Sequence, residues 1–270
     1  MTISKMNRTI SKTPFGKIML KCSSKIAYDS PDHIVPEGTR KDNSKNPKFN
    51  DKLFRLYGQE NQLKILNLGC AGGGFVRSCI DDGQIAMGLE GSDYSQKFKR
   101  AEWRIIPEYL FTCDITKEFN LYQDKNPFKF DAITCWEVME HIKQSDLPKL
   151  CSNIKKHLAT NGIWIMSISV VESSSHGVQL HQTVKPISWW RRELAQQGFV
   201  IRDDILKFFN KQFIRGESLK HKGSYNLVVT LPKNKPPKVP FVSWKLRLWE
   251  SWTRSSLHKW IKMIITGDII

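Results

Sequence analysis

Short apolar runs alternate with amphipathic stretches through the middle of this chain. The apolar runs predict strands near residues 63–68, 84–90, 109–113, 130–136 and 163–170. Helical spacing of apolar residues predicts helices near 74–82, 94–101, 145–159 and 187–197. Two more strand-like runs, 199–206 and 225–231, bring the expected sheet to about seven strands. The alternation predicts an α/β fold: a mostly parallel central sheet with helices on both faces.

The two ends of the chain lack this alternation. Residues 1–60 contain closely spaced turn signals and predict a basic, irregular arm, with a short helix at 49–57. Residues 232–238, rich in proline and lysine, are typical of a linker. We therefore expect three parts: an arm over 1–60 that is a candidate lid, a domain over 61–231, and a linker with a tail over 232–270.

The tail combines tryptophan with lysine and arginine. Leu246, Trp249, Leu257 and Ile264 approximate one helical stripe, which predicts an amphipathic helix. Such a composition is typical of a helix that lies on a membrane surface, so peripheral membrane contact is one hypothesis. Docking on the domain, oligomerisation and binding of a polyanion are alternatives that the sequence leaves open.

The net charge of +16 resides mainly at the ends. Residues 1–60 carry 12 Lys+Arg and 6 Asp+Glu, a net of +6, and residues 231–270 carry 8 and 2, again +6. Residues 61–230 carry 22 and 18, a net of only +4. Basic ends suit phosphate-rich partners such as RNA, or anionic lipid heads, and a solvated lysine-rich terminus explains them equally well.

The sequence predicts an intracellular protein. No run of 18 apolar residues is present, so no transmembrane segment is expected. The first 15 residues have no apolar signal core. The six cysteines show no C-x-x-C pairing, which favours reduced core thiols over zinc ligands or disulfides. We therefore expect a cytoplasmic location, with peripheral membrane association as the alternative.

A glycine-rich turn follows the first predicted strand. The run KILNL stops at Gly69, the turn continues through CAGGG, and an amphipathic stretch begins at Phe75. Strand, tight turn and helix bring backbone N–H groups close to a bound nucleotide, and glycine leaves room for that approach. Glu90 ends the next strand, 21 positions after Gly69, where a ribose-binding carboxylate is expected. By itself, such a match is also typical of an ordinary βα turn.

Further polar residues follow the other predicted strands. Asp114 ends the third strand, where its carboxylate can accept the amino group of adenine while Ile115 covers the ring. The fourth strand runs into WEVMEHI, residues 136–142. Ligands of open α/β sheets bind beyond the carboxyl ends of the strands. A solvated acid or a helix cap explains each residue singly, whereas the ordered set favours a nucleotide site.

Together these motifs resemble those of the class I S-adenosylmethionine (SAM)-dependent methyltransferases over residues 63–200. Gly69-x-Ala71-x-Gly73 resembles motif I, although Asn67 replaces the usual acid and Ala71 the middle glycine, so Asn67 carries no charge to attract the SAM ammonium. The resemblance implies a Rossmann-like class I methyltransferase fold with SAM as cofactor. The residues that it implies for cofactor binding are Asn67, Gly69, Cys70, Ala71, Gly73, Glu90, Gly91, Asp114, Ile115 and Trp136.

Glu137, Glu140 and His141 have the spacing of one helical turn, which would place all three on one side. Two carboxylates and an imidazole suit a divalent cation, which would lower the pKa of a substrate hydroxyl. The segment is similar to the Glu-x-x-Glu-His of metal-assisted O-methyltransferases of the ubiquinone pathway and of small RNA. That resemblance implies His181 as a fourth ligand, with His176 as the less favoured alternative. In many methyltransferases this segment holds no metal, and His141 then packs or acts as a base.

His181 stands before a predicted helix with Ser188 as its N-cap and Gly198 as its stop. The resemblance places this connection over the acceptor pocket, so His181 joins His141 and Glu137 as a candidate catalytic residue. Trp189 and Trp190 are expected either to wall the acceptor site or to pack in the core.

We therefore expect a SAM-dependent methyltransferase that transfers a methyl group to an oxygen by direct displacement at the sulfonium methyl. A small molecule, a glycan and RNA are all candidate acceptors. The alternative is a catalytically decayed methyltransferase fold that binds RNA or a membrane surface.

Overall fold

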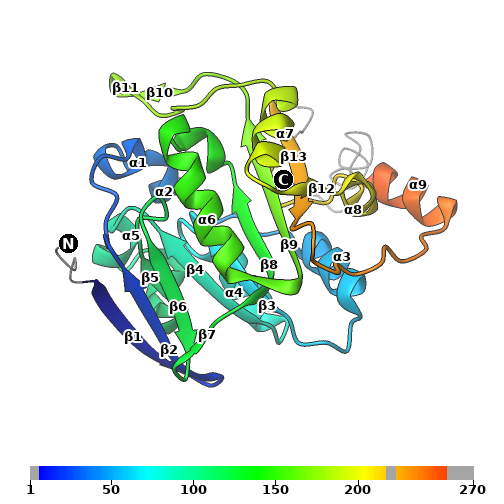
Figure 1. Cartoon of the computed structure of the whole chain (residues 1–270), viewed down its shortest axis with the longest axis horizontal. Coiled ribbons are helices and arrows are strands. Elements are labelled where there is room, and N and C mark those ends of the chain that lie inside the picture. Colours follow the sequence, from blue (N-terminus) through cyan, green and yellow to red (C-terminus); the bar gives the residue numbers. More distant parts are fainter. Residues whose placement is uncertain (1–5, 217–222, 254–270) are drawn as a thin grey trace, which may run out of the picture.

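A seven-stranded sheet forms the centre of the molecule in this computed structural model, which describes residues 6–216 and 223–253 (Figure 1). The strand order is β12-β13-β9-β8-β3-β4-β5. The strands are β3 (Lys64–Leu68), β4 (Ile85–Glu90), β5 (Leu110–Thr112), β8 (Phe130–Trp136), β9 (Leu158–Ser169), β12 (Val200–Ile201) and β13 (Ser224–Thr230). The first five are parallel, and β13 and β12 add antiparallel pairs at one edge. The predicted mostly parallel sheet of about seven strands is confirmed.

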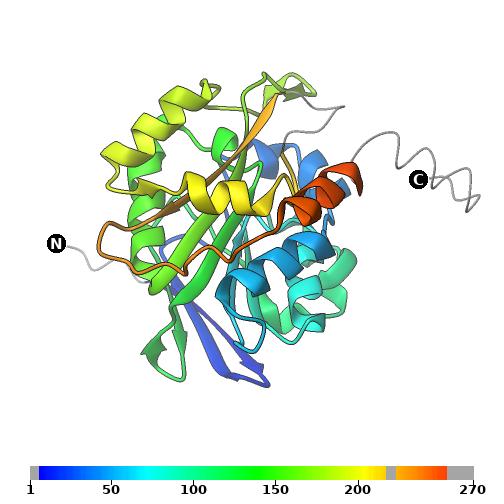
Figure 2. The ribbon, with the colours of Figure 1, turned by 90° about the vertical axis from the view of Figure 1, so that its right-hand side faces the viewer.

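Helices cover both faces of this sheet. In Figures 1 and 2, α6 (Leu147–His157) and α7 (Ile187–Gln196) lie on one side, and α3 (Pro47–Tyr57) and α4 (Gly74–Asp81) on the other. Every residue of β4 is buried as a result. This double coverage explains why the central strands read as unbroken apolar runs rather than alternating ones.

A second, four-stranded sheet of order β1-β2-β6-β7 flanks the first. Its strands are β1 (Asn7–Thr13), β2 (Gly16–Cys22), β6 (Phe119–Gln123) and β7 (Asn126–Pro127). The prediction of an irregular arm is therefore wrong for residues 7–22. Strand β2 buries Ile18, Leu20 and Cys22, and Leu20 lies opposite Leu121 of β6. The partner strand follows about a hundred residues later, so short-range patterning could not predict this pairing.

The rest of the N-terminal segment is helical. It forms α1 (Pro31–Ile34), α2 (Glu37–Lys41) and α3. The helix predicted at 49–57 is confirmed, and it begins two residues earlier because the Asn46 side chain accepts the N–H of Lys48 and Pro47 occupies the first turn.

The strand predicted at 199–206 is wrong beyond Ile201, because the chain turns into α8 (Asp203–Phe209). Ile205, Phe208 and Phe209 are buried at helical spacing, and the Phe209 ring stacks on Phe49 of α3 at 5.1 Å. An apolar run of this length does not by itself distinguish a buried strand from a buried helix.

Several predicted boundaries shift. The helix expected at 94–101 is only α5 (Tyr94–Lys97), followed by the 3₁₀ segments η1 (Ala101–Arg104) and η2 (Pro107–Tyr109). The N-cap of α7 is Pro186 rather than Ser188, because proline fixes φ and the helix begins at Ile187. Gly198, at φ +80°, follows the end of α7 as predicted.

The remaining elements are short. They are η3 (Met139–His141), η4 (Gln144–Asp146), β10 (Ser174–Ser175), β11 (Val178–Gln179) and α9 (Trp244–Thr253). The predicted tail helix is thus present as α9, while Leu257 and Ile264 lie outside the described residues. All six cysteines are free and buried. Within residues 6–216 and 223–253, no helix combines the length and the apolar composition needed to cross a bilayer.

Candidate active site

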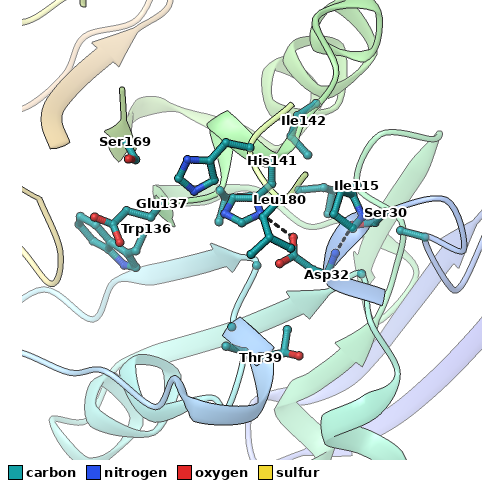
Figure 3. A pocket seen from close by; sticks show the side chains of 18 of the residues that line it. Ser30, Asp32, Thr39, Ile115, Trp136, Glu137, His141, Ile142, Ser169 and Leu180 are labelled. Atoms are coloured by element: carbon teal, nitrogen blue, oxygen red, sulfur yellow. Dashed lines mark hydrogen bonds and ion pairs between the residues drawn. The ribbon is translucent and has the colours of Figure 1, made fainter. Parts of the chain in front are cut away.

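A cavity of about 1160 Å³ opens at the carboxyl ends of the central strands. Its floor contains the residues that end or follow these strands: Gly69 after β3, Glu90 on β4, Asp114 after β5 and Trp136 on β8. Residues of the N-terminal segment between 24 and 42 form a second wall, and residues 211–216 a third. Figure 3 shows Thr39 and Asp32, from this N-terminal segment, facing the strand ends across the cavity.

The turn after β3 is shaped by close contacts. Gly69 has φ +65°, and a Cβ there would lie 2.5 Å from Cγ2 of Val138, so only glycine fits. Ala71 also has a left-handed φ, +46°, in place of the expected glycine. It is held there because its N–H donates to Glu90 Oε2 at 2.8 Å and its carbonyl accepts from Trp103 Nε1 at 2.8 Å.

Glu90 lies beneath this turn with 4% of its surface exposed. Oε2 accepts from the N–H of Ala71, and Oε1 accepts from the N–H of Ser92 at 3.0 Å. Burial raises the pKa of Glu90 to about 7, and these backbone hydrogen bonds only partly offset that effect. A ligand that donates hydrogen bonds to this carboxylate would favour its charged form.

Asp114 and Ile115 line the cavity beside Glu90. Asp114 Oδ1 accepts from the backbone N–H of Thr116 at 2.9 Å and from its hydroxyl at 2.6 Å, which fixes the carboxylate. The N–H of Asp114 donates to the carbonyl of Ser24, so the N-terminal segment is attached to the site at this point.

The cavity separates the expected cofactor residues into two groups. Its lining contains Gly69, Ala71, Glu90, Gly91, Asp114, Ile115 and Trp136, and does not contain Asn67, Cys70 or Gly73. Asn67 is buried within the sheet, where Oδ1 accepts from the hydroxyl of Thr134 at 3.0 Å. Cys70 Sγ packs against Gly88, so tightly that a Cβ on Gly88 would lie 2.7 Å away.

Glu137 does not share a helical turn with Glu140 and His141. It has φ +55° and precedes η3, so the geometry predicted from the spacing is wrong for this residue. Its carboxylate instead accepts from Arg215 Nη1 at 2.9 Å and from the hydroxyl of Ser224 at 2.8 Å. In Figure 3, Glu137 lies beside Trp136 and apart from the ring of His141.

Glu140, His141 and His181 do come together, with one ligand atom of each within 4.8 Å of the others. Glu140 is fully buried, and burial raises its pKa to about 7. Oε1 accepts the N–H of Ser169 at 2.8 Å, whereas Oε2 is buried without a hydrogen-bond partner within the described part of the chain. An unpaired buried carboxylate oxygen is costly, so a cation or donor beside it would stabilise the site.

Each of the two imidazoles has a partner on Nδ1. His141 Nδ1 lies 2.8 Å from Asp32 Oδ2, an ion pair drawn as a dashed line in Figure 3. Burial lowers the pKa of His141, but the hydrogen bond and charge of Asp32 outweigh it and raise the pKa overall. His181 Nδ1 lies 2.6 Å from the carbonyl of Val171, and burial keeps the pKa of His181 below its ordinary value.

The other residues considered from the sequence lie elsewhere. His176 contacts the hydroxyl of Ser175 between β10 and β11 and is not part of the three-residue cluster. Trp190 is fully buried, and neither it nor Trp189 lines the cavity, so the core-packing alternative holds rather than an acceptor wall.

Among the charged lining residues that the motifs did not identify, Asp32, Asp42 and Arg215 form ion pairs within the site. Asp32 contacts His141, and Arg215 joins Asp42 (Nη2 to Oδ1, 2.9 Å) to Glu137. None of the three lies in a recognisable motif or at a strand end, and the turn signals of residues 1–60 placed Asp32 and Asp42 only within a candidate lid.

A methyltransferase domain family matches residues 40–220 of the chain. The chain belongs to the class I SAM-dependent methyltransferases. Family membership therefore agrees with the sheet order and with the position of the cavity at the strand ends.

Individual relatives are distant. Ubiquinone biosynthesis O-methyltransferase of Glaesserella parasuis serovar 5 (strain SH0165) is 32% identical over 113 residues, which span 40% of this chain and 45% of that protein. A SAM-dependent methyltransferase from Clostridium acetobutylicum ATCC 824 shares the fold with a TM-score of 0.50 at 14% identity, covering 76% of this chain and 96% of that one. Magnesium protoporphyrin IX methyltransferase from Synechocystis PCC 6803 with bound SAM gives a TM-score of 0.45 at 15% identity, covering 68% of this chain and 78% of that one.

Proposed function

We propose that this protein transfers the methyl group of SAM to an oxygen atom of an acceptor by direct displacement at the sulfonium methyl. One observation carries the proposal: a single cavity is lined by Glu90 and Asp114 at one part and by His141 and His181 at another. The first pair suits a nucleoside, and the second suits proton removal from a hydroxyl.

The cofactor role rests on the strand-end residues. Glu90 presents a buried carboxylate that can accept hydrogen bonds from both ribose hydroxyls. Asp114 can accept a hydrogen bond from the adenine amino group, while Ile115 covers the adenine ring. SAM supplies an activated methyl group, so the main task of the protein is to align the acceptor oxygen with it.

The oxygen acceptor is supported by the two imidazoles and by the relative whose name specifies O-methylation. Because His181 Nδ1 faces a carbonyl, it is assigned the proton, which leaves Nε2 able to accept one from a hydroxyl. The cavity volume of about 1160 Å³ exceeds that of an ordinary ligand pocket and leaves room for a small molecule or one sugar unit beside SAM.

A divalent metal at Glu140, His141 and His181 is part of this proposal. The residues fit a cation: Glu140 Oε2 is buried without a described partner, and both imidazoles have Nδ1 engaged, so their Nε2 atoms are available. The pairing of His141 with Asp32 is the usual support of a metal-binding imidazole. A bound metal would lower the pKa of the acceptor hydroxyl. Glu137 is not assigned as a ligand, because Arg215 and Ser224 occupy its carboxylate.

Calorimetric titration with SAM and S-adenosylhomocysteine (SAH) tests the cofactor assignment. We expect binding by the wild type that Glu90→Ala abolishes, followed by transfer of label from methyl-labelled SAM to an acceptor in a metabolite extract. Absence of binding by either compound would refute the proposal. Methyl transfer that resists EDTA and Glu140→Gln would leave the cofactor assignment intact and remove the metal.

Peripheral membrane contact is a second candidate function, carried by α9 at the edge of the molecule (Figure 2). Trp244, Leu248 and Trp252 are spaced by four residues and are 66%, 60% and 40% exposed. Aromatic residues interleaved with Lys245 suit an anionic lipid interface. Co-sedimentation with phosphatidylserine vesicles that Trp244→Ser and Leu248→Ser abolish is expected; equal sedimentation of wild type and variant would refute it.

A non-catalytic, decayed fold is not favoured. Glu90, Asp114 and the two imidazoles all face the cavity, and the departures at Asn67 and Ala71 leave the turn closed by ordinary hydrogen bonds. Methyl transfer from labelled SAM would exclude this alternative.

A further inference from the structure

We propose that Asp42 and Arg215 bind the amino-acid end of the cofactor: Asp42 receives the α-ammonium and Arg215 the α-carboxylate. The inference rests on the proposed use of SAM. It assigns to Asp42 the negative charge that is missing beside the glycine-rich turn, where Asn67 replaces the usual acid. Neither residue belongs to the methyltransferase motifs of the sequence.

The motif itself offers no charge for the ammonium group. Asn67 is neutral, 3% exposed, and its carbonyl oxygen already accepts from the hydroxyl of Thr134. It is also absent from the cavity lining. A cationic ammonium inside the cavity needs an anionic partner, because a buried unpaired charge is costly.

Asp42 lies where that anion is needed. Its carbonyl accepts the N–H of Gly72 at 3.0 Å, next to Ala71, whose N–H binds Glu90. Glu90 and Asp42 are thus attached to consecutive residues of the same turn, whose Cα atoms are about 3.8 Å apart. A ribose on Glu90 therefore directs its methionine part along the turn toward Asp42.

The contact between Asp42 and the turn is close enough to require glycine. A Cβ on Gly72 would lie 2.6 Å from the carbonyl oxygen of Asp42. The side chain of Asp42 lines the cavity and is 22% exposed. Its contacts with Ser44 and Arg215 fall on Oδ1, which leaves lone pairs of Oδ2 for a ligand.

The charged form of Asp42 is favoured in spite of burial. Burial raises the pKa of this carboxyl, but the charge of Arg215 and the hydrogen bonds from Ser44 together hold it below the ordinary value. Asp42 is therefore ionised at neutral pH and able to pair with an ammonium.

Arg215 supplies the opposite charge. Nη1 and Nη2 lie 2.9 Å from Glu137 and Asp42, and the side chain of Arg215, which is 34% exposed, lines the cavity. A guanidinium group that lines a cavity is suited to a carboxylate. With Glu137, the three side chains carry a net charge of −1, which complements the net +1 of SAM.

Two ligands separate this role from a merely structural one. SAH carries the amino-acid end, while 5′-methylthioadenosine has the same adenine and ribose without it. The full chain is titrated calorimetrically with both ligands. We expect Asp42→Asn and Arg215→Gln each to lower the affinity for SAH by about ten- to hundredfold. The affinity for 5′-methylthioadenosine should not change.

Asp51→Asn is the matched control, because it removes an ion pair with Arg55 on the exposed side of α3, away from the cavity. It should leave both affinities as in the wild type. If Asp42→Asn lowered the affinities for the two ligands equally, or left the affinity for SAH unchanged, the inference would be overturned. A wild type that binds 5′-methylthioadenosine and SAH equally would overturn it while sparing the proposed function; a wild type that binds neither would refute both.

Discussion

The proposed contact between Glu90 and the cofactor predicts that cofactor binding depends on pH. Burial raises its pKa to about 7 in the free protein, from an ordinary value of 4.5. In the proposed binding mode the ribose hydroxyls donate to the carboxylate, so the ligand would bind the charged form and binding would release a proton wherever Glu90 is protonated. Affinity should therefore rise with pH up to about 8 and level off above it.

The size of the effect follows from the ionised fraction. With a pKa of about 7, roughly one eleventh of Glu90 is charged at pH 6 and roughly ten elevenths at pH 8. The dissociation constant should thus be about tenfold larger at pH 6, a difference of about 1.4 kcal/mol. Calorimetry with 5′-methylthioadenosine measures this cleanly, because that ligand has no amino-acid end to titrate.

Glu90→Gln tests the assignment, since an amide cannot titrate. The variant should bind weakly and with equal affinity at pH 6 and pH 8, whereas Glu118→Gln, which alters an exposed ion pair with Lys156, should retain the wild-type profile. A wild-type affinity that is flat over this range, or a slope that persists in Glu90→Gln, would refute the reasoning.

Three further outcomes are expected. Ala71→Gly should raise the free energy of unfolding in urea by about 0.5–1 kcal/mol, because Ala71 has φ +46°, whereas Ala86→Gly within β4 should lower it. Burial lowers the pKa of His157 to about 4, so the unfolded state binds more protons than the folded state below pH 6.5. The free energy of unfolding of the wild type should therefore fall by about 2 kcal/mol between pH 7 and pH 5. In His157→Gln this contribution to the decrease should be absent, and an unchanged decrease would contradict the lowered pKa of His157. Asp32→Asn should weaken Mn²⁺ binding, measured by electron paramagnetic resonance, by about ten- to hundredfold through its contact with His141, and unchanged affinity would remove Asp32 from the metal site.

The central sheet could be predicted because its strands are buried on both faces and read as apolar runs. Glu90 and Asp114 could be found for the same reason: they stand where those runs stop. The strand β1 escaped prediction because no residue in it is fully buried, so its sequence, NRTISKT, shows no apolar face.

The charged walls of the site could not be predicted from local patterns. Asp32 meets His141, and Asp42 meets Arg215, across more than a hundred residues of chain, and only the folded sheet brings them together. Glu137 shows the opposite error, because a favourable spacing predicted a shared helical turn that its positive φ breaks.

The N-terminal wall of the cavity has a practical consequence for how this protein can be divided. The family match begins at residue 40 and ends at 220, so a fragment with those limits would lack Asp32 and strand β13 of the central sheet. A fragment of 61–231 would lose Asp42 as well and leave the glycine-rich turn uncovered. The residues that enclose the cavity therefore begin ahead of the matched domain, and a truncation that omits residues 24–43 would remove one wall of the cavity.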